Sequence, residues 1–222
     1  MTDVKTILVG TVGQGIMRSA DGGENWGRIS IGAGLHSDAM VRTLLNTPTS
    51  PEIIFAGTDK GLVRSDDAGK TWHQVDSPMN DYTVWALAAD PGDPNLMFAG
   101  TGTPTPAALF RSSDAGKTWE KSSMEAAEEC PNVGVPRVTG IAVDPMTHND
   151  VWVGLEVDGL RHSSDGGDTW ETINGAIPNP DVHNVAVAGG PPKTVVVVVN
   201  NDVYTSTDNG GNWDRLGIKE VF

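Results

Sequence analysis

The sequence predicts an all-β repeat protein, and three observations support this class. One phrase of the form S-x-D-x-G-x-[T/N]-W occurs five times, short apolar runs stand at similar distances before its copies, and no long segment has helical periodicity. The repeats are roughly 45 residues long, a length typical of repeat architectures. The phrase ends at Trp26, Trp72, Trp119, Trp170 and Trp213.

Each repeat predicts four short strands. The apolar runs are rich in β-branched residues and are bounded by Gly, Pro, Asn and Asp, which is the signature of strands and their turns. Five such runs fill one slot: "TILVGT" (6–11), "IIFAGT" (53–58), "LMFAGT" (96–101), "VWVGL" (151–155) and "TVVVVV" (194–199). A strand is expected before this slot and two after it, and Met124–Glu129 predicts at most one helical turn.

Four-stranded units of this length, repeated radially, form the blades of a β-propeller. We therefore predict about five antiparallel blades in a single domain, 1–222, with the repeated phrase in each turn between the third and fourth strands. The first unit begins at its second strand and lacks an inner one. Residues 217–222 are expected to close that blade, and the alternative is a larger ring that another chain or further sequence completes.

The repeated phrase predicts a structural turn rather than an active site. Its Asp and Ser side chains can accept hydrogen bonds from backbone N–H groups of the turn, and its Gly supplies a positive φ at little cost. Its Trp can pack against a neighbouring sheet and donate the indole N–H to a carbonyl group. Five equal copies also argue against catalysis, which needs one constellation.

The phrase resembles the Asp-box, or bacterial neuraminidase repeat, and its five copies cover nearly the whole chain. This repeat occurs in sialidases, xyloglucanase-type glycoside hydrolases, sortilin-type receptors and a photosystem II assembly factor. The resemblance implies a β-propeller but leaves function open, because these proteins include enzymes, receptors and assembly factors. Sialidases use an arginine triad and a tyrosine–glutamate pair. Only Arg42 and Arg137 stand at the expected end here, so sialidase activity is not expected.

Composition excludes several partners. The 222 residues include 29 acidic and 15 basic ones, and a formal charge of −14 would repel nucleic acid and anionic membranes. Cys130 is the one cysteine, so no intrachain disulfide is possible. The N-terminus lacks a signal-peptide pattern and the longest apolar run is too short to span a bilayer. We expect a soluble, cytoplasmic protein without a cofactor.

Strand order predicts where a site would lie. The Asp-box turns occupy one end of the sheets, so the inner strands begin at the other end, beside loops of the kind that carry function. Aligning the repeats puts Arg42, Trp85, Thr139 and His183 at one position, with Arg137 and Asp181 two residues earlier. Ligand-binding candidates are Arg42, Asp81, Tyr82, Trp85 and Arg137.

Acid–base candidates stand at the same end of the repeats. They are His183, His36, Asp38 and Asp181, and histidine suits this chemistry because its ordinary pKa is about 6.5. The pairs His36–Asp38 and His183–Asp181 are two residues apart, which on strands puts both side chains on one face. Nothing in the sequence fixes the distance between these pairs, so no metal site is assigned. His148 and His162 are expected on the surface, and Cys130 has no basic neighbour that would activate it.

Two functions remain open on this sequence. The first is a binding propeller that recognises a small molecule, a glycan or a protein at the channel mouth opposite the Asp-boxes. The alternative is a hydrolase or lyase, glycosidase-like, that uses His183, His36 and nearby acids; Asp38, Asp81 or Asp181 would supply two-carboxylate chemistry. A homo-oligomer, or a second chain that completes the ring, is a further expectation.

Overall fold

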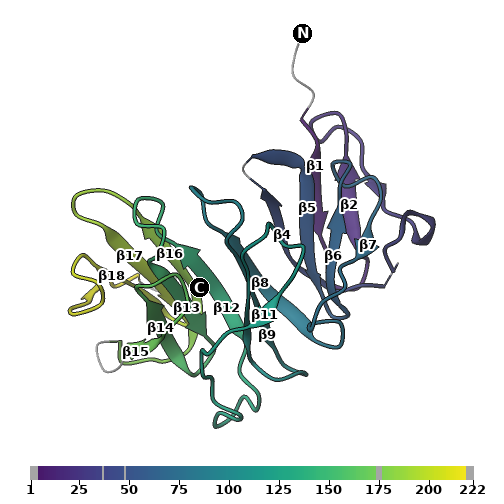
Figure 1. The fold of residues 1–222 in the computed structure, drawn as a ribbon. Coiled ribbons are helices and arrows are strands. Elements are labelled where there is room, and N and C mark those ends of the chain that lie inside the picture. Colours follow the sequence, from purple (N-terminus) through teal and green to yellow (C-terminus); the bar gives the residue numbers. More distant parts are fainter. Residues whose placement is uncertain (1–4, 37, 48, 174–176, 219–222) are drawn as a thin grey trace. The chain divides into compact units, whose positions relative to one another are not determined.

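The computed structural model describes residues 5–36, 38–47, 49–173 and 177–218. It divides the chain into two compact units, residues 1–85 and 86–222, and each is described by itself. The described residues form nineteen strands and one short 3-10 helix, η1 (Ile31–Ala33), so the all-β prediction is confirmed (Figure 1).

The first unit holds two antiparallel sheets, one for each of the first two repeats. The first sheet has three strands: β1 (Ile7–Gly10), β2 (Ile16–Ser19) and β3 (Gly27–Arg28). The second sheet has four: β4 (Val41–Thr47), β5 (Ser50–Thr58), β6 (Gly61–Ser65) and β7 (His73–Gln74). Within the described residues the first sheet thus lacks an inner strand, as the sequence predicts.

The second unit holds the other repeats, as three sheets of four antiparallel strands. The third sheet comprises β8 (Thr83–Ala89), which begins in the first unit, β9 (Met97–Gly102), β10 (Leu109–Ser112) and β11 (Glu120–Lys121). The fourth comprises β12 (Val138–Val143), β13 (Val151–Leu155), β14 (Gly159–Ser163) and β15 (Glu171–Ile173). The fifth comprises β16 (Val182–Ala188), β17 (Thr194–Val199), β18 (Asp202–Ser206) and β19 (Asp214–Arg215).

The second strand of each complete sheet forms the core. Phe55, Phe98 and Trp152 occupy the same place in β5, β9 and β13, and none of them is exposed to solvent. Removing such large side chains from water is the main favourable contribution to folding. The apolar runs of the third and fourth repeats, β9 and β13, are therefore covered on both faces.

The glycine near the end of these runs permits close contact with the next sheet. A Cβ atom on Gly100 would lie 2.3 Å from Val138 of β12, and one on Gly154 would lie 2.6 Å from Val182 of β16. Real Cβ atoms do not approach other atoms so closely, since interiors are packed to crystal-like density. The glycine thus lets each inner strand pack against the second strand of the preceding sheet.

The Asp-box turns have the predicted structure. They link the third and fourth strands of the complete sheets, and β2 to β3 in the first sheet. In the second box, Ser65 Oγ accepts from Gly69 N at 2.8 Å and donates to Asp67 at 2.9 Å, while Asp67 accepts from Thr71 N at 2.9 Å. The other four boxes repeat these bonds.

Two further contacts involve the box glycines: one lies inside each box, and the other joins three of the boxes to the preceding sheet. In all five boxes the indole N–H donates to the carbonyl group of the box glycine, at 3.0 to 3.2 Å. Three of the box glycines also lie over a large side chain of the preceding sheet: Gly69 over Leu8, Gly167 over Phe98, and Gly210 over Trp152. The boxes therefore join neighbouring sheets through direct contacts, as the sequence predicts.

Acid should weaken these turns. Hydrogen bonds from Thr71, Thr118 and Asn212 lower the pKa values of Asp67, Asp114 and Asp208 to about 2. A carboxylate whose pKa is lowered in the folded state contributes stability above its unfolded pKa of about 3.9, and this is lost as the pH falls through the folded value. We therefore expect the melting temperature, followed by circular dichroism, to fall as the pH drops from about 4 to about 2.

The Asp67→Asn variant is the control for this acid effect, because its amide does not titrate in that range. It should lose less stability than the wild type between the same two pH values. An equal loss in both proteins would mean that the box carboxylates do not govern acid stability.

Two expectations need comment. Met124–Glu129 forms no helical turn; Ala127 N instead donates to Asp158 at 2.9 Å and Met124 is buried, which holds this stretch irregular. Residues 219–222 lie outside the described residues, so closure of the first sheet by 217–222 and the single domain 1–222 stay predictions.

Candidate functional site

The inner strands of three sheets share a β-bulge near their first residue. The pairing of β4 with β5 shifts between Val41 and Thr43, that of β12 with β13 between Val138 and Gly140, and that of β16 with β17 between Val182 and Asn184. The extra residues are Arg42, Thr139 and His183. A bulge re-aims the side chain of its extra residue and is common next to functional sites.

A repeated backbone bond confirms the predicted register. Asp59 N donates to Met40 O, Glu156 N to Arg137 O, and Asn200 N to Asp181 O, at 2.9 to 3.2 Å. Arg137 and Asp181 therefore hold equivalent places two residues before the bulge, as the alignment predicts. This row lies at the opposite end of each sheet from the Asp-box turn, because consecutive strands alternate in direction.

In the first unit this row brings Arg42 and Trp85 together. The guanidinium carbon of Arg42 lies 4.2 Å from the centre of the Trp85 ring, the geometry of a cation–π contact. Arg42 Nη2 donates to the sulfur of Met40 at 3.4 Å, and its enclosed Nε has no hydrogen-bond partner in the structure. Every other arginine donates to an oxygen atom within the described residues.

In the second unit the arginine at this end of its sheet, Arg137, is held by an ion pair. The Arg137 guanidinium forms a bidentate pair with Glu156, and Nη2 lies 2.6 Å from Oε1. Such a pair satisfies the donor groups that a ligand would need. Glu156 follows β13 directly, and the sequence analysis did not name it, because its pairing with Arg137 joins residues 19 positions apart. This pairing makes Arg137 a weaker ligand-binding candidate than Arg42.

His183 and Asp181 lie on one face, as their spacing predicts. His183 Nε2 is 3.4 Å from Asp181 Oδ1, and about half of the His183 side chain is exposed. The neighbouring bulge residue, Thr139, donates from Oγ1 to Val182 O at 2.6 Å, which joins β12 to β16. Because Thr139 holds two strands together, we assign it a structural role.

The remaining candidates lie in loops before the inner strands. His36 and Asp38 are exposed residues in the loop between η1 and β4, so the expectation that they share a strand face is wrong. The reason is that Asp38 lies in a turn before β4 rather than in an extended strand. Asp81 is exposed and Tyr82 is half-buried, and both lie in the turn before β8.

The predicted surface position of His162 is wrong. Its side chain is buried, between Asp150 at 3.2 Å and Glu171 at 2.7 Å, and it stacks on Trp152. The signal for this burial is that His162 of β14 lies opposite Trp152 of β13. His148 is half exposed and lies 2.7 Å from the buried Asp90.

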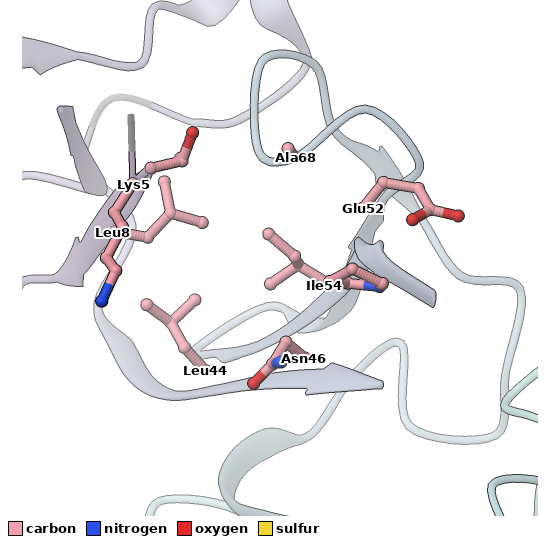
Figure 2. A pocket seen from close by; sticks show the side chains of 9 residues that line it. Lys5, Leu8, Leu44, Asn46, Glu52, Ile54 and Ala68 are labelled. Atoms are coloured by element: carbon pink, nitrogen blue, oxygen red, sulfur yellow. The ribbon is translucent and has the colours of Figure 1, made fainter. Parts of the chain in front are cut away.

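A pocket of about 690 Å³ lies elsewhere in the first unit (Figure 2). Leu8 of β1, Leu44 of β4 and Ile54 of β5 point into it, and Ala68 of the second Asp-box closes it on one side. None of the residues predicted for the site lines it. It lies toward the Asp-box end of the second sheet, whereas Arg42 lies at the other end.

Two classes of chemistry find no support among the described residues. Within them no group of three His, Cys, Asp or Glu side chains could hold a metal ion. Burial, together with the nearby Asp158, raises the pKa of Cys130, which opposes formation of a reactive thiolate.

In the part of the chain that the structure covers, no helix is long and apolar enough to cross a bilayer.

Comparisons with known proteins match the fold. A solved ancestral GH74 enzyme is 19% identical, with a TM-score of 0.77 over 96% of this chain and 29% of its own. A YCF48 structure with a bound D1 peptide is 18% identical, with a TM-score of 0.65 over 96% of this chain and 65% of its own. At these identities the likeness shows the fold alone, and the sheets are therefore blades of the β-propeller type.

The sequence matches point to the same repeat families. The xyloglucanase Xgh74A of Acetivibrio thermocellus is 27% identical in an alignment 229 residues long that covers 86% of this chain and 27% of that protein, so the chain spans about a quarter of its length. A BNR/Asp-box repeat model matches residues 63–74, the second box. The model described as photosynthesis system II assembly factor YCF48 matches residues 102–220, more than half of the chain. The chain belongs to that family of assembly factors.

Proposed function

We propose that this chain binds a polypeptide partner on its first unit, at the inner-strand end of the second sheet, with Arg42 and Trp85 as the main contacts. The observation that carries the proposal is the Arg42–Trp85 pair, because the guanidinium is held over the ring and donates to no oxygen atom within the described residues. An arginine positioned in this way can donate to a carboxylate or a backbone carbonyl group of a partner.

Two facts support a polypeptide as the partner. The chain belongs to the YCF48 family, and one solved YCF48 structure is described as bound to a D1 peptide. The chain's charge of −14 also disfavours polyanionic partners over long distances. Arg42 would then act at short range, on a single acceptor group, rather than as part of a basic surface.

The second candidate is a glycoside hydrolase, because the curated relative that is 27% identical is a xyloglucanase. Its acids would come from Asp38, Asp81 and Asp181. Asp181 Oδ1 lies 3.4 Å from His183 Nε2 without a hydrogen bond, and the other two are exposed loop residues. The general acid of a glycosidase is favoured by an enclosed, apolar setting, which exposed loop residues do not have. This candidate is therefore second.

Binding to a synthetic D1 peptide, measured by isothermal titration calorimetry, tests the proposal. We expect wild-type protein to bind, and Arg42→Gln or Trp85→Ala to weaken Kd by about tenfold or more, which corresponds to about 1.4 kcal/mol. The loss of folding stability in Arg42→Gln should stay below about 1.5 kcal/mol, since the side chain is not in the core.

Arg64→Gln is the matched control for this experiment. Arg64 also contacts an aromatic ring, that of Phe55, but it pairs with Asp66 and lies away from the inner strand. The control should bind the peptide with unchanged affinity. Hydrolysis of xyloglucan by the wild type without any peptide binding would favour the second candidate and overturn the first.

A further inference from the structure

His162 lies between two carboxylates in the middle of one row of the fourth sheet. The row runs across β13, β14 and β15, where Trp152, His162 and Glu171 face each other in register. The imidazole stacks on the indole of Trp152, with ring centres 4.2 Å apart and planes at 28°. Only 5% of His162 is exposed, so its protonation is coupled to the packing around it.

Both ring nitrogens of His162 face acceptors. Nδ1 lies 2.7 Å from Glu171 Oε1, and Nε2 lies 3.2 Å from Asp150 Oδ1. An ionised carboxylate can only accept hydrogen bonds, and a neutral imidazole has just one N–H group. Both contacts are therefore satisfied together only when the ring is doubly protonated and positively charged.

The same carboxylate joins the fourth sheet to the fifth. Asp150 accepts from Trp152 Nε1 at 2.6 Å and from Lys193 Nζ at 2.5 Å, and Lys193 belongs to the turn between β16 and β17. Trp152 also meets Trp213 of the fifth Asp-box edge to face, with ring centres 6.4 Å apart. A change at His162 thus reaches both the outer strand β15 and the contact between two sheets.

We propose that His162 is a proton-dependent latch: its imidazolium ties Glu171 of β15 to Asp150 at the sheet contact, and loss of one proton releases β15 as the pH rises. The neutral ring keeps one N–H group, so one of the two carboxylates loses its partner. Asp150 retains Lys193 and Trp152, whereas Glu171 is largely exposed and can turn to solvent. The contact that is lost is therefore the one between His162 and Glu171, and its loss frees β15.

The charged groups around His162 set the direction of the pH effect. They are Asp150 from the turn before β13, Glu171 from β15 and, beyond Asp150, Lys193, which also lies 3.5 Å from Asp144. Burial lowers the pKa of His162, but the hydrogen bonds to Asp150 and Glu171 outweigh burial and raise it. The latch is therefore fully closed below the unfolded pKa of about 6.5 and opens as the pH rises through the higher folded value.

Nitrogen NMR of the histidine rings tests the latch directly in the wild-type protein. We expect His162 to carry protons on both ring nitrogens at pH 6.5 and to titrate above the ordinary midpoint. In Glu171→Gln the midpoint should fall by about one unit, because a charged partner is removed. The wild type should also lose about 2–4 °C more of its melting temperature than Glu171→Gln between pH 6.5 and pH 9.

His73 and Asp66 provide the matched control. They form a comparable but exposed pair, with 3.8 Å between nitrogen and oxygen. Asp66→Asn should leave the pH dependence of the melting temperature as in the wild type. A His162 ring with one protonated nitrogen from pH 6 to pH 9, or a Glu171→Gln variant with the wild-type midpoint, would overturn the proposal. Glu171 is exposed, so this variant is expected to fold.

Discussion

Replacing Trp119 or Trp72 by alanine is expected to lower the free energy of unfolding by about 3–5 kcal/mol, the range for a large buried aromatic residue. Trp119 is 5% exposed and Trp72 is 4% exposed. Each indole N–H donates to the carbonyl group of its box glycine, at 3.2 Å. The alanine variants therefore lose both buried apolar area and a hydrogen bond, and leave a cavity beside the turn.

Trp26→Ala is the internal control for these variants. Trp26 occupies the same place in the first Asp-box and makes the same indole bond, at 3.0 Å, but 42% of it is exposed. We expect a clearly smaller loss of stability, since less apolar area is withdrawn from water. Urea unfolding of the three variants measures the difference. If Trp119→Ala and Trp72→Ala unfolded at the wild-type midpoint, the box tryptophans would not fasten neighbouring sheets.

Gly34→Ala is expected to cost about 2–4 kcal/mol, because steric overlap and backbone strain act together. Gly34 ends the 3-10 turn with φ of 90°, a conformation that residues with a side chain rarely adopt. A Cβ atom there would lie 1.8 Å from the carbonyl oxygen of Trp72, and that neighbour is backbone, which cannot turn away. The adjacent bond from Trp72 N to Ala33 O, at 2.7 Å, would have to stretch.

Gly13→Ala separates the two causes in the Gly34 variant. Gly13 has nearly the same φ, 89°, but nothing lies within 4 Å of the Cβ position. This variant should show only the cost of the backbone conformation, about 1 kcal/mol. Thermal unfolding of both variants measures the gap. Equal losses would mean that the contact between Gly34 and Trp72 relaxes without cost.

The position of the candidate site follows from the register of the inner strands. The regular spacing of the repeats is enough to predict that register. Val41, Val138 and Val182 begin equivalent inner strands, and the residue after each one is the bulge residue. The alignment predicts this level because the repeats differ little in length between the inner strand and the Asp-box. It does not predict the bulge, which depends on how two strands pair rather than on the composition of either one.

The partners of the candidate residues were harder to anticipate. Arg137 and Arg42 look alike in sequence, yet the first is held by Glu156 and the second lies over Trp85 with its Nε unpaired. Glu156 contacts Arg137 across one sheet. Trp85 contacts Arg42 from a neighbouring sheet. Pairing over such distances depends on sheet packing, and one sequence carries no direct signal for it.

The sequence by itself determined the architecture of this protein: five repeats, their strand order, and an Asp-box turn built from serine, aspartate, glycine and tryptophan. It could do so because these features depend on contacts within a few residues and on a spacing that recurs. Only the tertiary structure decided which polar side chains are buried and with what partners, as for His162 between Asp150 and Glu171. Burial and charge pairing arise when separate strands and sheets pack, so the same histidine reads as exposed in the sequence and lies enclosed in the fold.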